Sequence, residues 1–276
     1  MFTMEEDQAA RVLVVPAGEV GTRVAARIAG QLPSISCLSG SAPFDEVGRA
    51  AGHTDMMIIV GGLEDAAAAA RAAQSAALAS QSATCQVSIA LIASSSLSRS
   101  SQALESLAAL RLSVDALFQV SGDSLAALDE TAPQVLTMGA VEEYLVRLVA
   151  TTIARMTTES GIICLDYADI KAIMSEGGSG AIVGVGISRD AGEAARKSLQ
   201  ALRRQGLEPE QSPGVLVAVC GSTNLTMDQF DAASGIIHRA INEEANLIIG
   251  MLIDDELAGN IRVVTMAKDG RPKRET

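Results

Sequence analysis

Two glycines and two acids meet at the end of an apolar run in this chain of 276 residues. The run from Met56 to Val60 ends in Gly61 and Gly62, and Glu64 and Asp65 follow before an alanine-rich stretch. Bare backbone amides at a helix start can bind phosphate, and glycine lets a ligand approach closely. Acids at a helix start are instead stabilised by its positive end, and they would repel a triphosphate. We therefore interpret this segment as an ordinary capped helix.

The residue types that build metal and nucleophile sites are sparse. The two histidines, His53 and His238, cannot form a histidine-rich metal site, and no cysteine belongs to a CxxC pair. We interpret the cysteines as buried apolar residues in a reducing cytoplasm, and the acidic run 254–256 as a solvated turn. We expect no metal site. The cysteines are Cys37, Cys85, Cys164 and Cys220.

The composition excludes several classes of protein. With 48% hydrophobic residues, the chain can bury a core, which excludes a disordered protein. A net charge of −12 and a sequence pI of about 4.6 make nucleic acid and anionic lipid poor partners. Apolar runs such as 56–63 are too short to span a membrane, and no basic, apolar leader opens the sequence. We expect a cytoplasmic protein with no membrane span.

Apolar periodicity predicts strands that alternate with helices in the first half. Strands are expected at 11–18, 56–62, 87–96 and 114–122, and helices at 20–32, 64–80 and 104–112. Such alternation indicates an α/β fold, with a Rossmann-like, mainly parallel sheet and helices on both faces. A longer apolar stripe at 134–158 predicts a long helix that ends at Ser160 and Gly161.

The second half predicts a smaller α+β domain. Strands are expected at 180–188, 214–222, 246–254 and 261–269, and helices at 191–204 and 227–242. Because the connection between the last two strands is short and polar, we expect them to pair as a hairpin. The predicted organisation is a first domain at 1–133, a central helix at 134–161, a second domain at 162–270 and a basic tail at 271–276.

The second half also carries a continuous series of motifs. The string ICLDYADIKAIM (163–174) is similar to the pattern N-[LV]-D-F-A-D-[VI]-x-x-[VI]-M, and GVLVAVCGSTNLTMDQF (214–230) to G-V-L-V-N-[IV]-T-G-G-x-D-L-T-L. IIGMLIDDEL (248–257) and IRVVTMAKDG (261–270) continue the match. These patterns are those of FtsZ, and the chain resembles the tubulin/FtsZ superfamily of cytoskeletal GTPases of bacterial division. The resemblance implies the tubulin/FtsZ-like fold.

The same resemblance implies that the GTP-binding half is degenerate. The family holds GTP with the loop G-G-G-T-G-T-G, of which only Gly61 and Gly62 remain here. Of the family's first glycine cluster, Gly18 and Gly21 remain, with the acid Glu19 between them. We therefore expect no bound cofactor. GTP with Mg²⁺ is expected only if the chain is a diverged but active GTPase.

Other positions of the family's nucleotide pocket are changed as well. The aspartate that reads guanine falls at Tyr144, with Glu143 beside it. The motif I-P-N-D-R-L becomes VSGDSL, which leaves Asp123. These three residues and the four glycines are residual pocket positions in this interpretation.

One functional element of the family is retained, the pair Asp166 and Asp169. In FtsZ-like filaments, this loop inserts into the nucleotide of the neighbouring subunit, and its two carboxylates orient the attacking water. The family's asparagine at the start of the loop is Cys164 here. The alternative is structural: Asp166 caps the following helix and Asp169 lies in its first turn, where acids are favoured.

Three functions stay open. The first is a pseudo-GTPase that binds or modulates a filament through the face carrying Asp166 and Asp169, in longitudinal contact with itself or with a true FtsZ. The second is a diverged, active GTPase that polymerises. The third is a non-enzymatic scaffold unrelated to FtsZ filaments. Because the sequence ends soon after residue 270, we expect no FtsZ-type adaptor-binding peptide.

Overall fold

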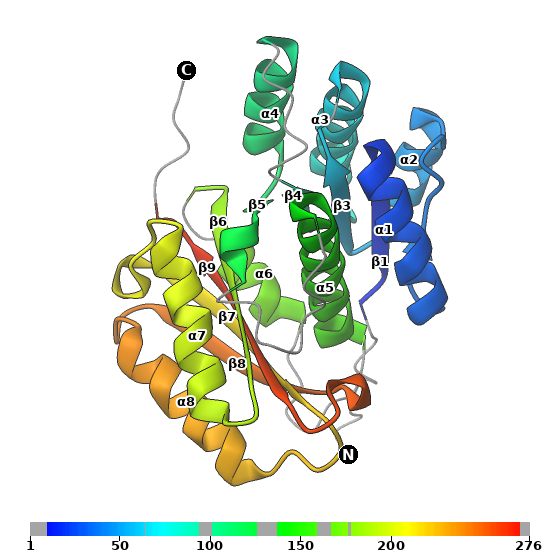
Figure 1. The fold of residues 1–276 in the computed structure, drawn as a ribbon. Helices are drawn as coiled ribbons and strands as arrows, with labels where there is room; N and C mark the ends of the chain where they lie inside the picture. The colour runs from blue at the N-terminus through cyan, green and yellow to red at the C-terminus, as the bar shows by residue number, and fades with distance from the viewer. Residues whose placement is uncertain are drawn as a thin grey trace, which may run out of the picture.

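A computed structural model describes residues 10–63, 65–93, 101–125, 137–158, 167–175 and 178–270. Within these ranges, one mixed sheet of nine strands has helices on both faces (Figure 1). The strand order across the sheet is β2-β1-β3-β4-β5-β6-β9-β7-β8. The strands are β1 (Val12–Ala17), β2 (Ser36–Cys37), β3 (Met56–Gly62), β4 (Val87–Ala93), β5 (Ala116–Val120), β6 (Gly180–Ser188), β7 (Gly214–Gly221), β8 (Asn246–Ile253) and β9 (Ile261–Lys268).

The strands of the N-terminal half run parallel. β1, β3, β4 and β5 pair in that order, and the short β2 pairs with β1 on the outer edge. A helix links each strand to the next, and such crossover connections return the chain in the same direction. The predicted Rossmann-like parallel sheet is therefore confirmed. The linking helices are α1 (Gly18–Gln31), α2 (Phe44–Ala51), α3 (Ala66–Gln81) and α4 (Ser101–Ser113).

Side chains of the parallel strands alternate between two buried clusters. In β1, Val14 belongs to a cluster with α1 and two later helices, whereas Val15 belongs to a cluster with α2, α3 and α4. The first of the later helices is the predicted central helix, whose buried stripe includes Leu145, Val149 and Ile153. These helices are α5 (Met138–Thr158) and α6 (Tyr167–Ser175).

The C-terminal half continues the same sheet. Helices α7 and α8 pack on one face of β7 and β9, and the other face joins the cluster of α5 and α6. Figure 1 shows α7 and α8 together on the side away from α3 and α4. The remaining elements are η2 (Gly122–Ser124), α7 (Ala191–Arg204), η3 (Pro209–Gln211), α8 (Met227–Ala240) and η4 (Asp255–Leu257).

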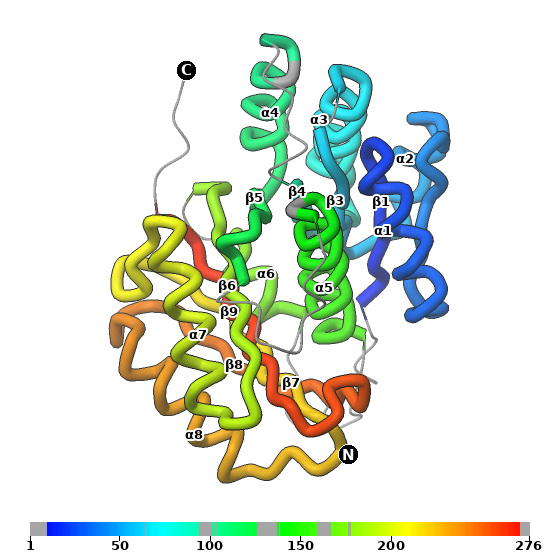
Figure 2. The backbone as a smooth tube through the Cα atoms, in the orientation of Figure 1, coloured from blue at the N-terminus to red at the C-terminus, as the bar shows by residue number. Residues whose placement is uncertain are grey.

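The expected hairpin of the last two strands is wrong. β8 pairs with β7 in parallel, and β9 lies between β6 and β7, antiparallel to both (Figure 2). The turn at 254–260 therefore carries the chain past the end of β7. Every residue of β9 is buried, whereas β8 is half-buried. A strand that is buried on both faces is most stable inside a sheet with both edges paired, and this decides its position.

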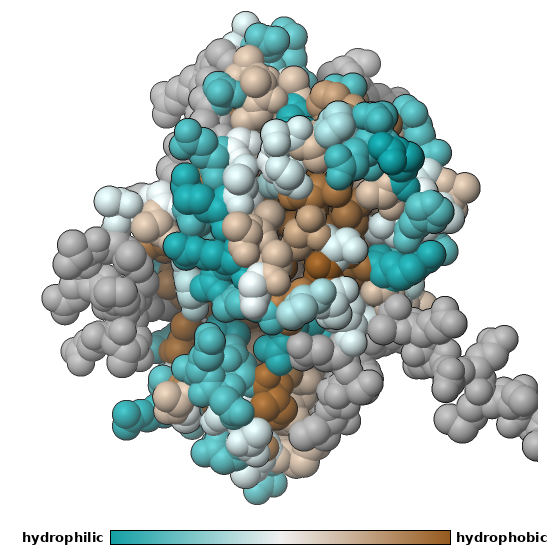
Figure 3. All heavy atoms as spheres, turned by 90° about the vertical axis from the view of Figure 1, so that its right-hand side faces the viewer, coloured by the Kyte–Doolittle hydropathy of each residue, from teal (hydrophilic) through white to brown (hydrophobic). Residues whose placement is uncertain are grey.

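Apolar periodicity did not predict β2 and α2. A strand of two residues and a helix of eight residues are too short to produce a recognisable period. Figure 3 shows the side of the molecule that carries α1 and α2, where hydrophilic residues border a smaller apolar area.

Candidate functional site

The carboxyl ends of the parallel strands gather most of the predicted nucleotide positions. Gly18 follows β1 directly, Gly61 and Gly62 end β3, and Asp123 lies in η2 after β5. Because parallel strands end at the same edge of a sheet, these residues share one edge, which we call the carboxyl edge. α1 and α3 begin at this edge, and helix starts in such a place commonly bind phosphate groups.

Three of the four predicted glycines are required by the fold itself. A Cβ atom on Gly21 would lie 2.2 Å from the carbonyl oxygen of Val60, and one on Gly61 would lie 2.0 Å from that of Ala17. α1 therefore crosses β3 at backbone contact. Gly18 has a φ of +70°, a left-handed conformation that favours glycine. The need for these glycines thus follows from chain packing, without reference to a ligand.

An acid occupies the start of α3. Asp65 Oδ1 accepts a hydrogen bond of 2.7 Å from the backbone N–H of Ala68. The predicted helix cap is therefore confirmed for Asp65, whereas Glu64 lies outside the described residues. Glu19, in the first turn of α1, has a side chain that is 91% exposed. A phosphate at the start of α3 would have to displace a carboxylate already bonded to the helix.

Arg71 ties together the loops beside this edge, and no sequence pattern pointed to it. Its guanidinium donates to the carbonyl oxygens of Pro16 at 3.0 Å, Ala42 at 2.8 Å and Ser39 at 3.2 Å. The guanidinium carbon lies 5.7 Å from the ring centre of Phe44. Burial lowers the pKa of Arg71, but an arginine stays charged at neutral pH. The sequence feature that could have pointed to Arg71 is that it is the one charged residue of the alanine-rich α3.

Glu143 and Tyr144 have different partners on α5. Glu143 accepts a hydrogen bond of 2.9 Å from Arg23 Nε and lies 3.9 Å from Arg27 Nη2, both on α1. The Glu143 side chain is 13% exposed, so these ion pairs link α5 to α1. The Tyr144 ring lies under the guanidinium of Arg147, 5.6 Å from ring centre to Cζ, and lines a pocket beside η4.

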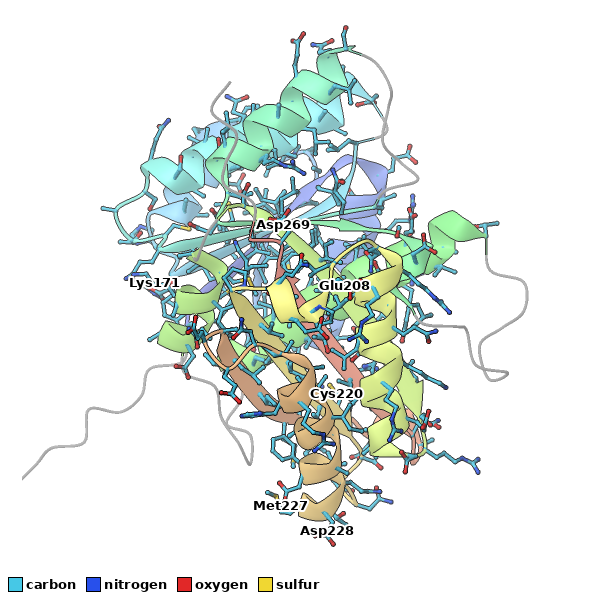
Figure 4. The ribbon with its side chains drawn as sticks, turned by 90° about the vertical axis from the view of Figure 1, so that its left-hand side faces the viewer. Lys171, Glu208, Cys220, Met227, Asp228 and Asp269 are labelled. Carbon is cyan, nitrogen blue, oxygen red and sulfur yellow. The ribbon has the colours of Figure 1, made fainter. Side chains whose placement is uncertain are left out.

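α6 lies at the opposite edge of the sheet, where the parallel strands begin. Tyr167 Oη donates to the carbonyl oxygen of Asp55, the residue before β3, at 2.8 Å. Lys171 Nζ donates to Oε1 of Gln86, the residue before β4, at 2.7 Å. We call this edge the amino edge. Figure 4 labels Lys171 well away from Asp228, which lies at the start of α8.

Asp169, one of the two acids predicted for filament contact, belongs to this amino edge. Asp169 lies in the first turn of α6 and is partly exposed, in a position where a helix stabilises an acid. Asp166 and Cys164 lie outside the described residues. The structure therefore places Asp169 on the opposite edge of the sheet from Gly18, Gly61 and Gly62.

An ion pair and a buried lysine hold the amino edge together. Asp55 accepts hydrogen bonds from Arg11 Nη2 at 2.7 Å, Nε at 3.0 Å and the backbone N–H at 2.8 Å. The hydrogen bond from the Arg11 side chain lowers the pKa of Asp55. Lys268 is 1% exposed, and its Nζ donates to the carbonyl oxygens of Asp115 at 2.6 Å and Met174 at 2.7 Å.

The acidic turn after β8 is only partly solvated. Asp255 and Glu256 are exposed, as predicted, but the Asp254 side chain is 15% exposed. It accepts a hydrogen bond of 2.6 Å from Arg262 Nη2, whose side chain is 9% exposed. The prediction of a solvated residue is therefore wrong for Asp254, because a buried arginine neutralises its charge.

The described residues contain no group of three or more His, Cys, Asp or Glu side chains placed to hold a metal ion. Burial raises the pKa of the Cys37 and Cys85 thiols to about 11, so both are protonated at neutral pH. Of the helices in the ranges given above, none is long and apolar enough to cross a membrane.

Comparison with known proteins identifies the C-terminal half and the fold. Residues 179–270 match the FtsZ family, C-terminal domain. The fold is similar to that of an empty FtsZ dimer of M. jannaschii, with a TM-score of 0.76 and 20% identity over 98% of this chain and 94% of that chain. It is also similar to CetZ from Methanosaeta thermophila, with a TM-score of 0.64 and 12% identity over 95% of this chain and 87% of that chain. The GTPγS-bound protofilament of CetZ2 from Haloferax volcanii gives a TM-score of 0.63 and 13% identity, over 94% of this chain and 92% of that chain.

The family match covers β6 to β9, and the structural matches extend the same fold across the N-terminal half. The family match includes the motifs found in the sequence at 214–270. Residues 179–270 therefore match the C-terminal domain of the FtsZ family, and the fold of the chain is that of FtsZ and CetZ.

Proposed function

We propose that this chain is a pseudo-GTPase that binds or modulates a filament of FtsZ-like subunits. It would contact the next subunit in the filament direction through its amino edge, with Asp166 and Asp169 facing that subunit. The neighbour is a second copy of this chain or a true FtsZ that carries its own nucleotide. A chain of this kind would sit on the nucleotide end of the neighbour and block further growth.

The observation that carries the proposal is the hydrogen bond between Ala68 N–H and Asp65 Oδ1. A triphosphate bound at the start of α3 would need this amide and would meet the Asp65 charge at contact distance. Glu19 adds a second acid at the start of α1. The net charge of the protein is −12, so these two acids add to a negative potential at the carboxyl edge that would repel a polyanion such as GTP.

The placement of the two edges supports a filament contact. Residues of the family's nucleotide pocket lie at the carboxyl edge, and α6 lies at the amino edge, so one copy can present its amino edge to the carboxyl edge of another. Association is also the state of the relatives, since the FtsZ structure is a dimer and the CetZ2 structure is a protofilament.

The first experiment measures nucleotide binding and turnover by the pure protein. Calorimetry with GTP and Mg²⁺ is expected to give a dissociation constant weaker than about 1 mM, a binding free energy of only about 4 kcal/mol. Phosphate release from GTP is expected to equal that of a protein-free sample. Micromolar GTP binding with measurable turnover would contradict the pseudo-GTPase part of the proposal.

The second experiment mixes the protein with FtsZ of the same source. The GTPase rate and mean filament length of FtsZ are expected to change, and Asp166→Ala with Asp169→Ala should remove that change. The matched control is Asp228→Ala with Asp231→Ala, two exposed acids on α8. If the protein still changes FtsZ after loss of Asp166 and Asp169, another face makes the contact. If neither the original protein nor any variant changes FtsZ, the result favours an unrelated scaffold.

A second candidate is a diverged GTPase that polymerises by itself. It is favoured by the convergence of the α1 and α3 starts on the carboxyl edge, the arrangement in which nucleotides commonly bind. The binding experiment above separates the two candidates directly.

A further inference from the structure

A pocket of about 450 Å³ lies between α5, the end of α1 and the turn that follows β8. Its volume is in the range of sites for small organic molecules. In Figure 1, η4 lies beside the carboxyl-terminal end of α5, and a hydrogen bond of 2.6 Å from Arg155 Nη2 to the carbonyl oxygen of Ile253 fixes this approach. None of the residues proposed for filament contact lines this pocket.

Buried polar atoms without a hydrogen-bond partner concentrate in this pocket. Among the described residues there are six such side-chain atoms, and three of them line the pocket: Arg147 Nε, Thr151 Oγ1 and Arg262 Nε. Arg262 is only 8% exposed. A buried donor left without an acceptor destabilises the fold, so three in one cavity indicate an acceptor that belongs there.

Hydrogen bonds through other nitrogen atoms hold the guanidinium groups of Arg147 and Arg262, and their Nε–H groups have no hydrogen-bond partner. Arg147 Nη1 donates to Gln31 Oε1 at 2.8 Å, and its plane lies over the Tyr144 ring. Arg262 Nη2 donates to Asp254 Oδ2 at 2.6 Å. These partners orient both arginines before any ligand arrives, which lowers the entropy cost of binding.

The chemistry of the orphan atoms selects the ligand. A guanidinium Nε–H can only donate, and a threonine hydroxyl can donate as well. Asp254 balances the charge of Arg262, so Arg147 and Arg155, which also lines the pocket, supply the positive charge that attracts a ligand anion. The exposed acids Asp255 and Glu256 also line the pocket, and they would repel an extended polyanion more strongly than a small anion.

From these contacts we infer that the pocket binds a small organic molecule through a carboxylate or phosphate group, held by Arg147, Thr151 and Arg262. The ligand bridges α5 to β9 and to the turn after β8. Its binding therefore holds the central helix against the C-terminal half of the sheet and raises the stability of the whole chain. The site is independent of the function proposed above.

The test uses calorimetry and thermal unfolding of the full chain with three probes at constant ionic strength: inorganic phosphate, succinate and, as reference, chloride. Saturable binding of phosphate or succinate is expected, with a rise in Tm that chloride does not give. If only succinate binds, the ligand group is a carboxylate, and if only phosphate binds, it is a phosphate. A site with a submillimolar dissociation constant would be saturated at an anion concentration of about 10 mM. If neither anion shows saturable binding up to that concentration, the inference is overturned.

Three variants locate the binding. Thr151→Val keeps the shape of the side chain but loses the hydroxyl, so the empty protein should be as stable as before or more stable, while anion binding weakens about tenfold. Arg147→Lys keeps the charge but loses Nε–H and should weaken binding by a similar factor. Arg49→Gln, on the exposed face of α2, is the control. Equal binding by all three variants would place the anion elsewhere and refute the site.

Discussion

Lys268 Nζ donates a hydrogen bond of 2.7 Å to the carbonyl oxygen of Met174, the residue before the last of α6. The ammonium group belongs to the last residue of β9, and Met174 lies 94 positions earlier in the sequence. A cation at the carboxyl end of a helix satisfies free carbonyl groups and is stabilised by the helix dipole. This contact therefore fixes the helix that carries Asp169.

Replacing Lys268 by methionine should destabilise the protein by about 2–3 kcal/mol. The change leaves the carbonyl oxygens of Asp115 and Met174 without this donor in a buried place. Urea unfolding at pH 7 measures the difference. Lys171→Met, which removes a contact to the Gln86 side chain, is the control and should change stability by less than about 0.5 kcal/mol. Equal losses for both lysines would contradict the role of Lys268.

Two glycines of α1 should respond oppositely to alanine. Gly21→Ala would bring a methyl group within 2.2 Å of the Val60 carbonyl oxygen, so we expect a loss of more than about 2 kcal/mol or failure to fold. A methyl group on Gly30 would have nothing within 4 Å of it, so Gly30→Ala should stabilise the helix by up to about 1 kcal/mol. Thermal unfolding compares the two. A tolerated Gly21→Ala would contradict the backbone contact of α1 with β3.

Arg71→Lys should lower stability by about 1–3 kcal/mol, although the charge is kept. An ammonium group cannot reach the three carbonyl groups that the planar guanidinium joins, so at least one loses its donor. Hydrogen exchange should also show faster exchange at Leu38 and Ala42, in the loop that Arg71 holds. Arg49→Lys, an exposed pair with Asp45, should change neither quantity. Unchanged exchange in the loop would argue against this role.

The ion pair of Asp55 and Arg11 should give a stability that depends on pH. The folded pKa of Asp55 lies below its unfolded value of about 3.9, so its stabilisation is complete above that value and is lost as the pH falls through the folded pKa. Asp55→Asn should therefore cost about 1 kcal/mol at pH 7 and much less at about pH 2. Unfolding curves of both proteins across this range provide the test. A difference that stays constant with pH would show that the carboxylate charge is not its source.

Asp65→Ala should destabilise α3 by about 1 kcal/mol, because the Ala68 amide loses its cap. Asp65→Asn retains a side-chain oxygen for the cap and removes the charge, so its stability should stay close to that of the original protein. Circular dichroism during urea unfolding measures both. The Asn variant also tests the repulsion of phosphate, since GTP binding that appears only in this variant would identify the Asp65 charge as the obstacle.

The sequence predicted the elements well where they have a strong pattern. The apolar runs of β1, β3 and β7 and the stripe of α5 are long enough to specify their type, because burial of one face requires a fixed period. The order of the last strands could not be predicted in this way. A short polar connection between β8 and β9 fits a hairpin locally, but burial of β9 on both edges is a property of the whole sheet.

The candidate site was predicted only in part. The helix cap formed by Asp65 is a contact between residues three positions apart, so it could be predicted from the local sequence. Arg71 and Lys268 were missed because their acceptors are backbone carbonyls far away along the chain, which no local pattern encodes. The pocket of Arg147, Thr151 and Arg262 was missed for the same reason, since β9 meets α5 only in the folded chain.

By itself, the sequence determined the alternation of strands and helices and the FtsZ motifs within residues 179–270, because these depend on residue types at short spacing. The tertiary structure decided which edge of the sheet carries Asp169, which glycines the backbone contacts require and which buried donors share a pocket. Those relationships join residues that are distant in sequence, and they arise only when burial of the sheet brings the two halves of the chain together.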